Sequence, residues 1–172
     1  MTDTPKIVPS LWFDKDTEEA LSFYVSLFNG SPHKRRDSKI MSIKRYEIGM
    51  EVPAADEMEG KVLTAIFELD GQRFMALDGG PLFKFNEAVS FYVECEDQEE
   101  VDYFWNKLSA VPEAEACGWL KDPFGLSWQI NPRQMGDLLA SSNKTKSLAA
   151  MNAMLKMKKI VIADVQTAYD QP

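Results

Sequence analysis

Asp16-Thr-Glu-Glu-Ala-Leu-Ser-Phe-Tyr-Val-Ser-Leu27 has a counterpart 81 residues later, because Asp97-Gln-Glu-Glu-Val-Asp-Tyr-Phe-Trp-Asn-Lys-Leu108 repeats its pattern of acidic, aromatic and aliphatic residues. In both copies an acidic start is followed by aromatic and aliphatic residues at helical spacing. A short apolar run precedes each copy, at 7–13 and at 88–95. A strand followed by an amphipathic helix, present twice in one chain, predicts two similar modules.

The residues after each helix predict the remaining strands. The first module should continue with strands near 42–48, 62–69 and 72–77, with Asp70-Gly71 as a tight turn. The second should continue with strands near 116–121 and 126–131, joined by a turn at 122–125. The modules therefore occupy about 5–80 and 88–131 of a domain that spans 5–132. Beyond Pro132 the pattern becomes helical, which predicts a helical C-terminal extension over 133–172.

The composition narrows the classes of function. The chain has 172 residues, a net charge of −8 and 45% hydrophobic residues, as expected of a folded acidic protein. An acidic protein is a poor partner for nucleic acid, and the basic run at 33–36 is interpreted as a solvated loop. No apolar run approaches the roughly 20 residues that span a bilayer, no secretion signal is evident, and two cysteines are too few for a disulfide framework. We therefore expect a cytoplasmic protein with no membrane partner.

Several segments of the chain resemble one known family. These are Pro9-Ser-Leu-Trp-Phe-Asp14, Phe67-Glu-Leu-Asp-Gly-Gln-Arg-Phe-Met-Ala-Leu77, Gly79-Gly-Pro-Leu-Phe-Lys-Phe-Asn-Glu87 and Cys117-Gly-Trp-Leu-Lys-Asp-Pro-Phe-Gly-Leu-Ser-Trp-Gln129. Over about residues 5–132 the chain resembles the PhnB-like branch of the vicinal oxygen chelate superfamily, which includes glyoxalase I and the bleomycin-resistance proteins. This branch often carries the label 3-demethylubiquinone-9 3-methyltransferase domain. The resemblance implies an α+β fold in which two βαβββ modules form a curved mixed sheet around a cavity.

The resemblance also implies where members of the superfamily bind a metal ion. Its four ligand positions fall on Pro9, Met75, Ser90 and Gln129 of this chain. Zinc, nickel and iron sites need imidazole, carboxylate or thiolate ligands, so this set predicts no metal. A methyl donor is usually held by a glycine-rich turn between a strand and a helix, whereas the glycine pairs here lie between predicted strands. We therefore expect no cofactor.

Strand alternation predicts which side chains line the cavity. The predicted ligand-binding residues are Leu11, Phe13, Arg73, Met75, Phe85, Ser90, Tyr92 and Gln129. Tyr92 and Gln129 would orient the ligand, and Arg73 would lie nearer the rim with Glu94. Phe85 belongs to the aromatic loop 82–86, a candidate lid wall. The alternate positions should pack under the helices, namely Trp12, Phe74, Phe91, Val93 and Trp128. Alternatively, these residues only fill the concave face of the sheet, with Arg73 and Glu94 paired across it.

These features lead to one expected function and two alternatives. We expect the chain to bind a small, partly apolar molecule without a metal ion, and to form a homodimer. The first alternative is an enzyme of the same superfamily, of lyase, transferase or oxygenase type or the labelled methyltransferase, with Tyr92, Glu94 or Asp78 supplying acid–base chemistry. The second is a protein-interaction module that uses the methionine-rich stretch at 145–158. Whether the chain is an enzyme stays open at this point.

Overall fold

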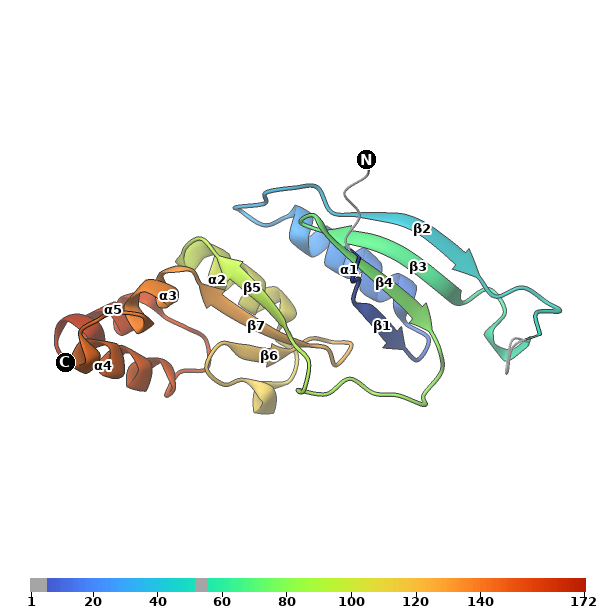
Figure 1. Cartoon of the computed structure of the whole chain (residues 1–172). Helices are drawn as coiled ribbons and strands as arrows, with labels where there is room; N and C mark the ends of the chain where they lie inside the picture. Colours follow the sequence, from blue (N-terminus) through green and yellow to red (C-terminus); the bar gives the residue numbers. More distant parts are fainter. Residues whose placement is uncertain (1–5, 52–55) are drawn as a thin grey trace. The chain divides into compact units, whose positions relative to one another are not determined.

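The chain folds into two compact units, which the computed structural model describes over residues 6–51 and 56–172. Unit 1 consists of the residues up to Gly30 together with 34–84, and unit 2 consists of 31–33 and 85–172. Each unit combines a mixed sheet with helices on one of its faces (Figure 1). The predicted α+β class, with two related modules and C-terminal helices, is therefore confirmed.

Unit 1 contains a four-stranded sheet with the order β1-β4-β3-β2. Its strands are β1 (Ser10–Phe13), β2 (Lys39–Arg45), β3 (Val62–Leu69) and β4 (Gln72–Asp78). β1 runs parallel to β4, and the other neighbours are antiparallel. A short 3-10 turn, η1 (Asp56–Met58), precedes β3. The second strand was predicted near 42–48 and in fact begins at Lys39, three residues earlier.

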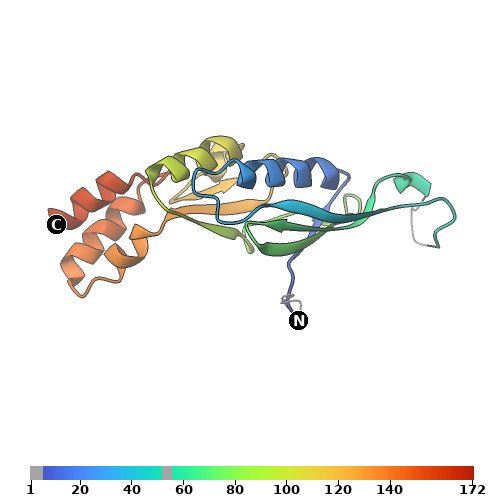
Figure 2. The ribbon, with the colours of Figure 1, turned by 90° about the horizontal axis from the view of Figure 1, so that it is seen from above.

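Helix α1 (Thr17–Asn29) covers one face of this sheet (Figure 2). Its buried side chains, Ala20, Leu21, Tyr24 and Leu27, recur at helical spacing, as the sequence predicted. On the strands, the rings of Phe67 and Phe74 stack with centroids 5.2 Å apart and are buried on the same face. The buried Asp78 fastens the start of the helix to the sheet, because its carboxylate accepts the backbone N–H groups of Thr17 and Val62, each at 2.9 Å.

Unit 2 repeats this arrangement with one strand fewer. The sheet has the order β5-β7-β6, built from β5 (Phe91–Cys95), β6 (Trp119–Lys121) and β7 (Ser127–Pro132), and β5 runs parallel to β7. Helix α2 (Gln98–Leu108) covers one face of it with buried Val101, Phe104, Trp105 and Leu108. A short 3-10 turn, η2 (Pro112–Ala114), precedes β6. In each unit the first strand, which precedes the helix, thus pairs in parallel with the last strand.

The C-terminal extension forms a small helical cluster within unit 2. It consists of α3 (Gln134–Leu139), α4 (Lys144–Met154) and α5 (Ile162–Asp170) around a core of Met135, Ala150, Ile160 and Val165. The segment between α4 and α5 is tied to the sheet, since the N–H groups of Cys117 and Gly118 donate to the carbonyls of Met157 and Lys158 at 2.7 and 2.8 Å. Gln98 adds a side-chain clamp by donating to the Ile160 carbonyl and accepting the Ile162 N–H. Among the described helices, none has the length and apolar character needed to cross a membrane.

Candidate functional site

Each sheet has one face covered by its helix and one open face. The pairing register of the strands shows which side chains lie on the open face. In the parallel pair of β1 and β4, Ser10 lies opposite Met75 and Trp12 lies opposite Leu77. These side chains face away from α1, as does Arg73 two residues before Met75. Met75 and Arg73 thus share the open face of unit 1, as predicted.

Leu11 and Phe13 do not join this face, which corrects the prediction that they line the cavity. They pair with Ala76 and Asp78 and are buried under α1, at 6% and 3% exposure. Trp12, which was expected to pack under the helix, lies on the open face instead.

The cause of this error is the length of the strand–helix connection. Three residues, 14–16, separate β1 from α1, whereas only two, 96–97, separate β5 from α2. The helices therefore correspond at a spacing of 81 residues and the strands at a spacing of 82. Phe13, buried under α1, corresponds to the equally buried Cys95. A shift of one residue moves every strand side chain to the other face of the sheet.

Trp12 is held in place at the end of β4. Its indole N–H donates to the Gly80 carbonyl at 2.9 Å, and Phe83 meets the ring edge-on with centroids 5.0 Å apart. A Cβ on Gly79 would lie 2.2 Å from the indole carbons, so the ring needs a glycine at this position. The two phenylalanines of the aromatic loop that was predicted as a lid wall belong to different units. The exposed Phe83 contacts Trp12 in unit 1, and the half-buried Phe85 belongs to unit 2.

The open face of unit 2 carries a row of three side chains that crosses all three strands. Gln129 on β7 lies opposite Tyr92 on β5 and opposite Trp119 on β6. The Gln129 amide donates to the Ser90 hydroxyl at 2.8 Å, so three of the predicted site residues come together here. Tyr92 is 57% exposed. Partial burial raises the pKa of its phenol, and the nearby Glu94 carboxylate adds to this effect.

Two residues of this face were missed or undervalued by sequence reasoning. Trp119 was not among the predicted site residues, although antiparallel pairing across the turn at 122–125 places it opposite Gln129. Ser127 is 1% exposed, and its hydroxyl has no hydrogen-bond partner among the described residues. The side chains predicted to pack under the second helix do so, as shown by the 5.6 Å ring contact of Phe91 with the buried Trp128.

The charged residues of the predicted rim pair within their own units. Arg73 contacts Glu68 at 3.2 Å, and Glu94 contacts Arg133 at 3.4 Å. Asp78, an alternative acid–base candidate, is committed to the two backbone N–H groups at the start of α1 and β3.

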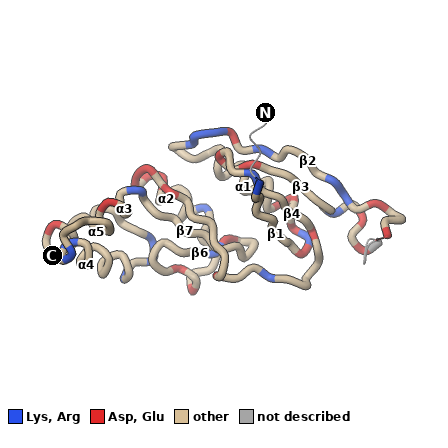
Figure 3. Tube along the Cα trace, in the orientation of Figure 1, with Lys and Arg blue, Asp and Glu red and all other residues tan. Residues whose placement is uncertain are grey.

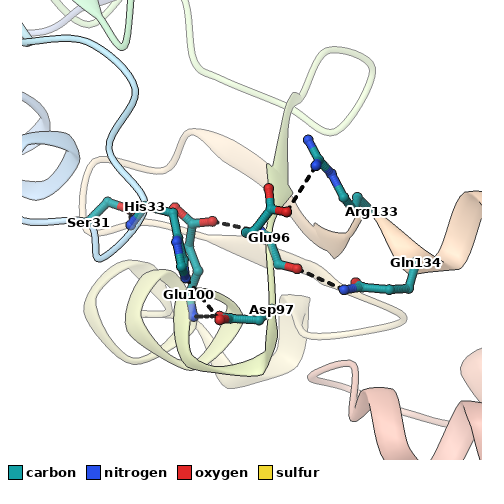
Figure 4. A network of polar contacts seen from close by, with 7 residues as sticks. All are labelled: Ser31, His33, Glu96, Asp97, Glu100, Arg133 and Gln134. Carbon is teal, nitrogen blue, oxygen red and sulfur yellow. Dashed lines mark hydrogen bonds and ion pairs between the residues drawn. The ribbon is translucent and has the colours of Figure 1, made fainter.

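The start of α2 carries a network of polar contacts (Figure 4). Asp97 caps the helix by accepting the Glu100 N–H at 3.0 Å, and its second oxygen contacts the Nε2 of His33 at 2.9 Å. Glu100 is buried and accepts the Ser31 hydroxyl and the Glu96 N–H. The hydrogen bond to Asp97 raises the pKa of His33, and the carboxylates of Glu100 and Glu96 reinforce it against partial desolvation. The network anchors residues 31–33 to α2, and we assign it a structural role.

Unit 1 also contains a charged pocket of about 260 Å³ beside the start of α1. It is lined by Lys15, Glu18, Arg45, Glu59, Gly60, Lys61, Val62 and Asp78. The Arg45 guanidinium binds both oxygens of Glu18 at 2.8 Å, and this contact holds the pKa of Glu18 below its usual range. Because its lining is charged and contains little apolar surface, this pocket is a weaker candidate for a partly apolar molecule than the open sheet faces.

The resemblance assigned the metal-ligand positions to Pro9, Met75, Ser90 and Gln129, but at the observed strand spacing of 82 residues Pro9 corresponds to Phe91 and not to Ser90. None of these four side chains is a strong metal ligand. The Gln129 amide is bonded to Ser90, and the Pro9 carbonyl accepts the Met75 N–H at 2.9 Å as part of the sheet. Within residues 6–51 and 56–172, no three His, Cys, Asp or Glu side chains gather in an arrangement that could hold a metal ion. The two thiols are also poor metal ligands, because burial raises the pKa of Cys95 and of Cys117 and so disfavours the thiolate that binds a metal ion.

Comparison with known proteins places the chain in a family. A family model described as 3-demethylubiquinone-9 3-methyltransferase matches residues 5–131. A PhnB protein from Bacillus cereus is 36% identical, with a TM-score of 0.58 over 74% of this chain and 99% of that one. The chain belongs to this PhnB-like family. A protein from Pseudomonas aeruginosa, 22% identical, has the same fold, with a TM-score of 0.56 over 75% of this chain and 98% of its own. No curated protein matches the chain.

The description of the PhnB-like family names a methyltransferase, and the strand–helix connections of this member bear on that activity. A nucleoside-containing methyl donor is commonly held by a glycine-rich connection and the free N–H groups of the following helix. The connections at 14–16 and 96–97 contain no glycine. The N–H of Thr17 donates to Asp78, and that of Glu100 donates to Asp97. These residues do not fit a methyl donor bound in that manner.

Proposed function

We propose that this PhnB-like chain binds a small, partly apolar molecule without the help of a metal ion, on the open face of the unit 2 sheet. The row of Tyr92, Gln129 and Trp119 carries the proposal. Two aromatic side chains flank an amide on one rigid sheet, which suits a planar ligand that has a few polar atoms. Because the Gln129 nitrogen is bonded to Ser90, the amide is held in one orientation and presents its carbonyl oxygen as an acceptor.

The test is ligand-induced thermal stabilisation, with a panel of planar aromatic amides as probes. Tyr92→Ala or Gln129→Ala should reduce the shift in melting temperature by at least half while the unliganded protein keeps its circular dichroism spectrum. Tyr103→Ala is the matched control, because Tyr103 lies on α2, which covers the opposite face of the same sheet. If both site variants keep the full shift, the assignment of this face is wrong.

We further propose that the chain works as a homodimer in the cytoplasm, with residues 5–132 as the binding domain and 133–172 as an accessory extension. Exposed apolar side chains such as Leu82 and Val89 support a second copy as a partner. The mass in solution, measured by light scattering at two concentrations, tests the dimer, and a mass of 19.5 kDa at both concentrations would contradict it.

A further inference from the structure

We propose that the open face of unit 1 forms a site of its own for an organic carboxylate, which Arg73 binds. This inference goes beyond the proposed function, which rests on the separate sheet of unit 2. It is carried by a row of charged side chains that crosses three strands of one sheet.

The row contains more positive than negative charge. Glu68 on β3 lies opposite Arg73 on β4 and opposite Lys39 on β2. One Glu68 oxygen is 3.2 Å from an Arg73 terminal nitrogen, and the other is 3.8 Å from the Lys39 ammonium. A single carboxylate thus lies between two cations, and the row as a whole retains one positive charge.

The guanidinium of Arg73 is only partly used by the protein. It offers five N–H donors in a planar fork that matches a carboxylate at two points. Glu68 occupies one of these donors. The Nε of Arg73 is buried and has no hydrogen-bond partner among the described residues. Buried donors without a partner are rare in folded proteins, so the guanidinium retains hydrogen-bonding capacity that Glu68 does not use.

Further cations surround this end of the sheet. The loop before β2 contains Lys34, Arg35 and Arg36, visible as the blue segment that leads into β2 in Figure 3. The Arg36 side chain packs over the β3–β4 turn, where a Cβ on Gly71 would lie 2.7 Å from the Arg36 Cδ. Asp70 in that turn is occupied by the backbone N–H groups of residues 35 and 36. The local field therefore favours an anion.

The neighbouring row on the same face is apolar at its centre. Met75 on β4 lies opposite Ile66 on β3, and both side chains are half-buried. Trp12 on β1 lies opposite Leu77 in the next row of the same face. Along β4, the cation Arg73 is therefore followed by apolar side chains. This order matches an organic carboxylate with an apolar body, such as an arylalkanoate, and suits neither a free inorganic anion nor a neutral hydrocarbon.

The test compares 4-phenylbutyrate with its neutral amide, by isothermal titration of the full chain. The wild-type protein should bind the acid at least tenfold more tightly than the amide. Arg73→Gln should abolish this preference, whereas Lys107→Gln, which removes the same charge on α2 of the other unit, should keep it. Glu68→Gln should strengthen acid binding, because it frees Arg73 from its partner. This variant provides an independent test if Arg73→Gln folds poorly.

The inference is overturned if the acid does not bind, if acid and amide bind equally well, or if Arg73→Gln keeps the preference. In these cases the proposed function still stands if the binding of aromatic amides depends on Tyr92 and Gln129. Acid binding that depends on Arg73 but is unchanged in Tyr92→Ala and Gln129→Ala supports a carboxylate site on unit 1 that is separate from the unit 2 face.

Discussion

Gly79 must be a glycine because the Trp12 indole occupies the space of a side chain. We predict that Gly79→Ala lowers the free energy of unfolding by about 1–3 kcal/mol, since a rigid ring and the sheet cannot both yield to a methyl group 2.2 Å away. Urea unfolding measures the loss, and tryptophan fluorescence reports the displaced indole. Gly136→Ala is the matched control, because no atom lies within 4 Å of its added methyl group and the helical position favours alanine. Equal effects of the two substitutions would contradict the prediction.

His33 is the sole histidine of the chain, so its pKa can be measured by NMR without assigning the signals. Its pKa should exceed the ordinary value of 6.5 on account of Asp97. The folded-state pKa is raised, so the stabilisation from this contact is fully present below the unfolded-state value and is lost as the pH rises through the folded-state value.

The variant Asp97→Asn separates charge from helix capping, because asparagine caps a helix as well as aspartate does. We expect the pKa of His33 to return toward 6.5 in this variant while the helix content stays the same. An unchanged titration curve would show that the contact at 2.9 Å does not persist in solution.

At the scale of elements, the C-terminal extension is predicted to be a stabilising part of unit 2. Ile160→Ala should cost about 2–5 kcal/mol, because Ile160 is fully buried among the core of α3, α4 and α5. Leu148→Ala, in the same extension but 60% exposed, should change the stability by less than about 0.5 kcal/mol. Chemical unfolding of both variants decides the question. Equal, small effects would favour the alternative that the extension serves a partner and not the fold.

The helices of this chain were easier to predict from the sequence than the orientation of its strands. Helices α1 and α2 were predictable because a buried stripe at 3.6-residue spacing depends only on local sequence. The open face of unit 2 was predictable for the same reason, since Ser90, Tyr92 and Gln129 alternate as expected. The side of the sheet on which Leu11 and Phe13 lie was not predictable, because the connection from β1 to α1 is one residue longer than the connection from β5 to α2. The position of each residue is set by pairing with a neighbouring strand, which cannot be inferred from one sequence alone.

At the scale of the whole molecule, the family match ends at residue 131 while the chain continues with three more helices. The backbone hydrogen bonds of Cys117 and Gly118 to the extension show that these helices are integrated into unit 2. The sequence indicated the helices but not these anchors, because they join loops whose conformation no periodic pattern describes. Cys117 itself has a positive φ of 53°, which a pattern of hydrophobic residues cannot predict.

The unequal strand–helix connections set a rule for protein engineering. Anyone who grafts a binding group from one half of this molecule onto the other must count 82 residues in the first strand and 54 in the last, because Ser10 with Met75 corresponds to Tyr92 with Gln129. Helix positions instead transfer at 81. A transplant that used the helical offset in the first strand would bury the new functional group under a helix.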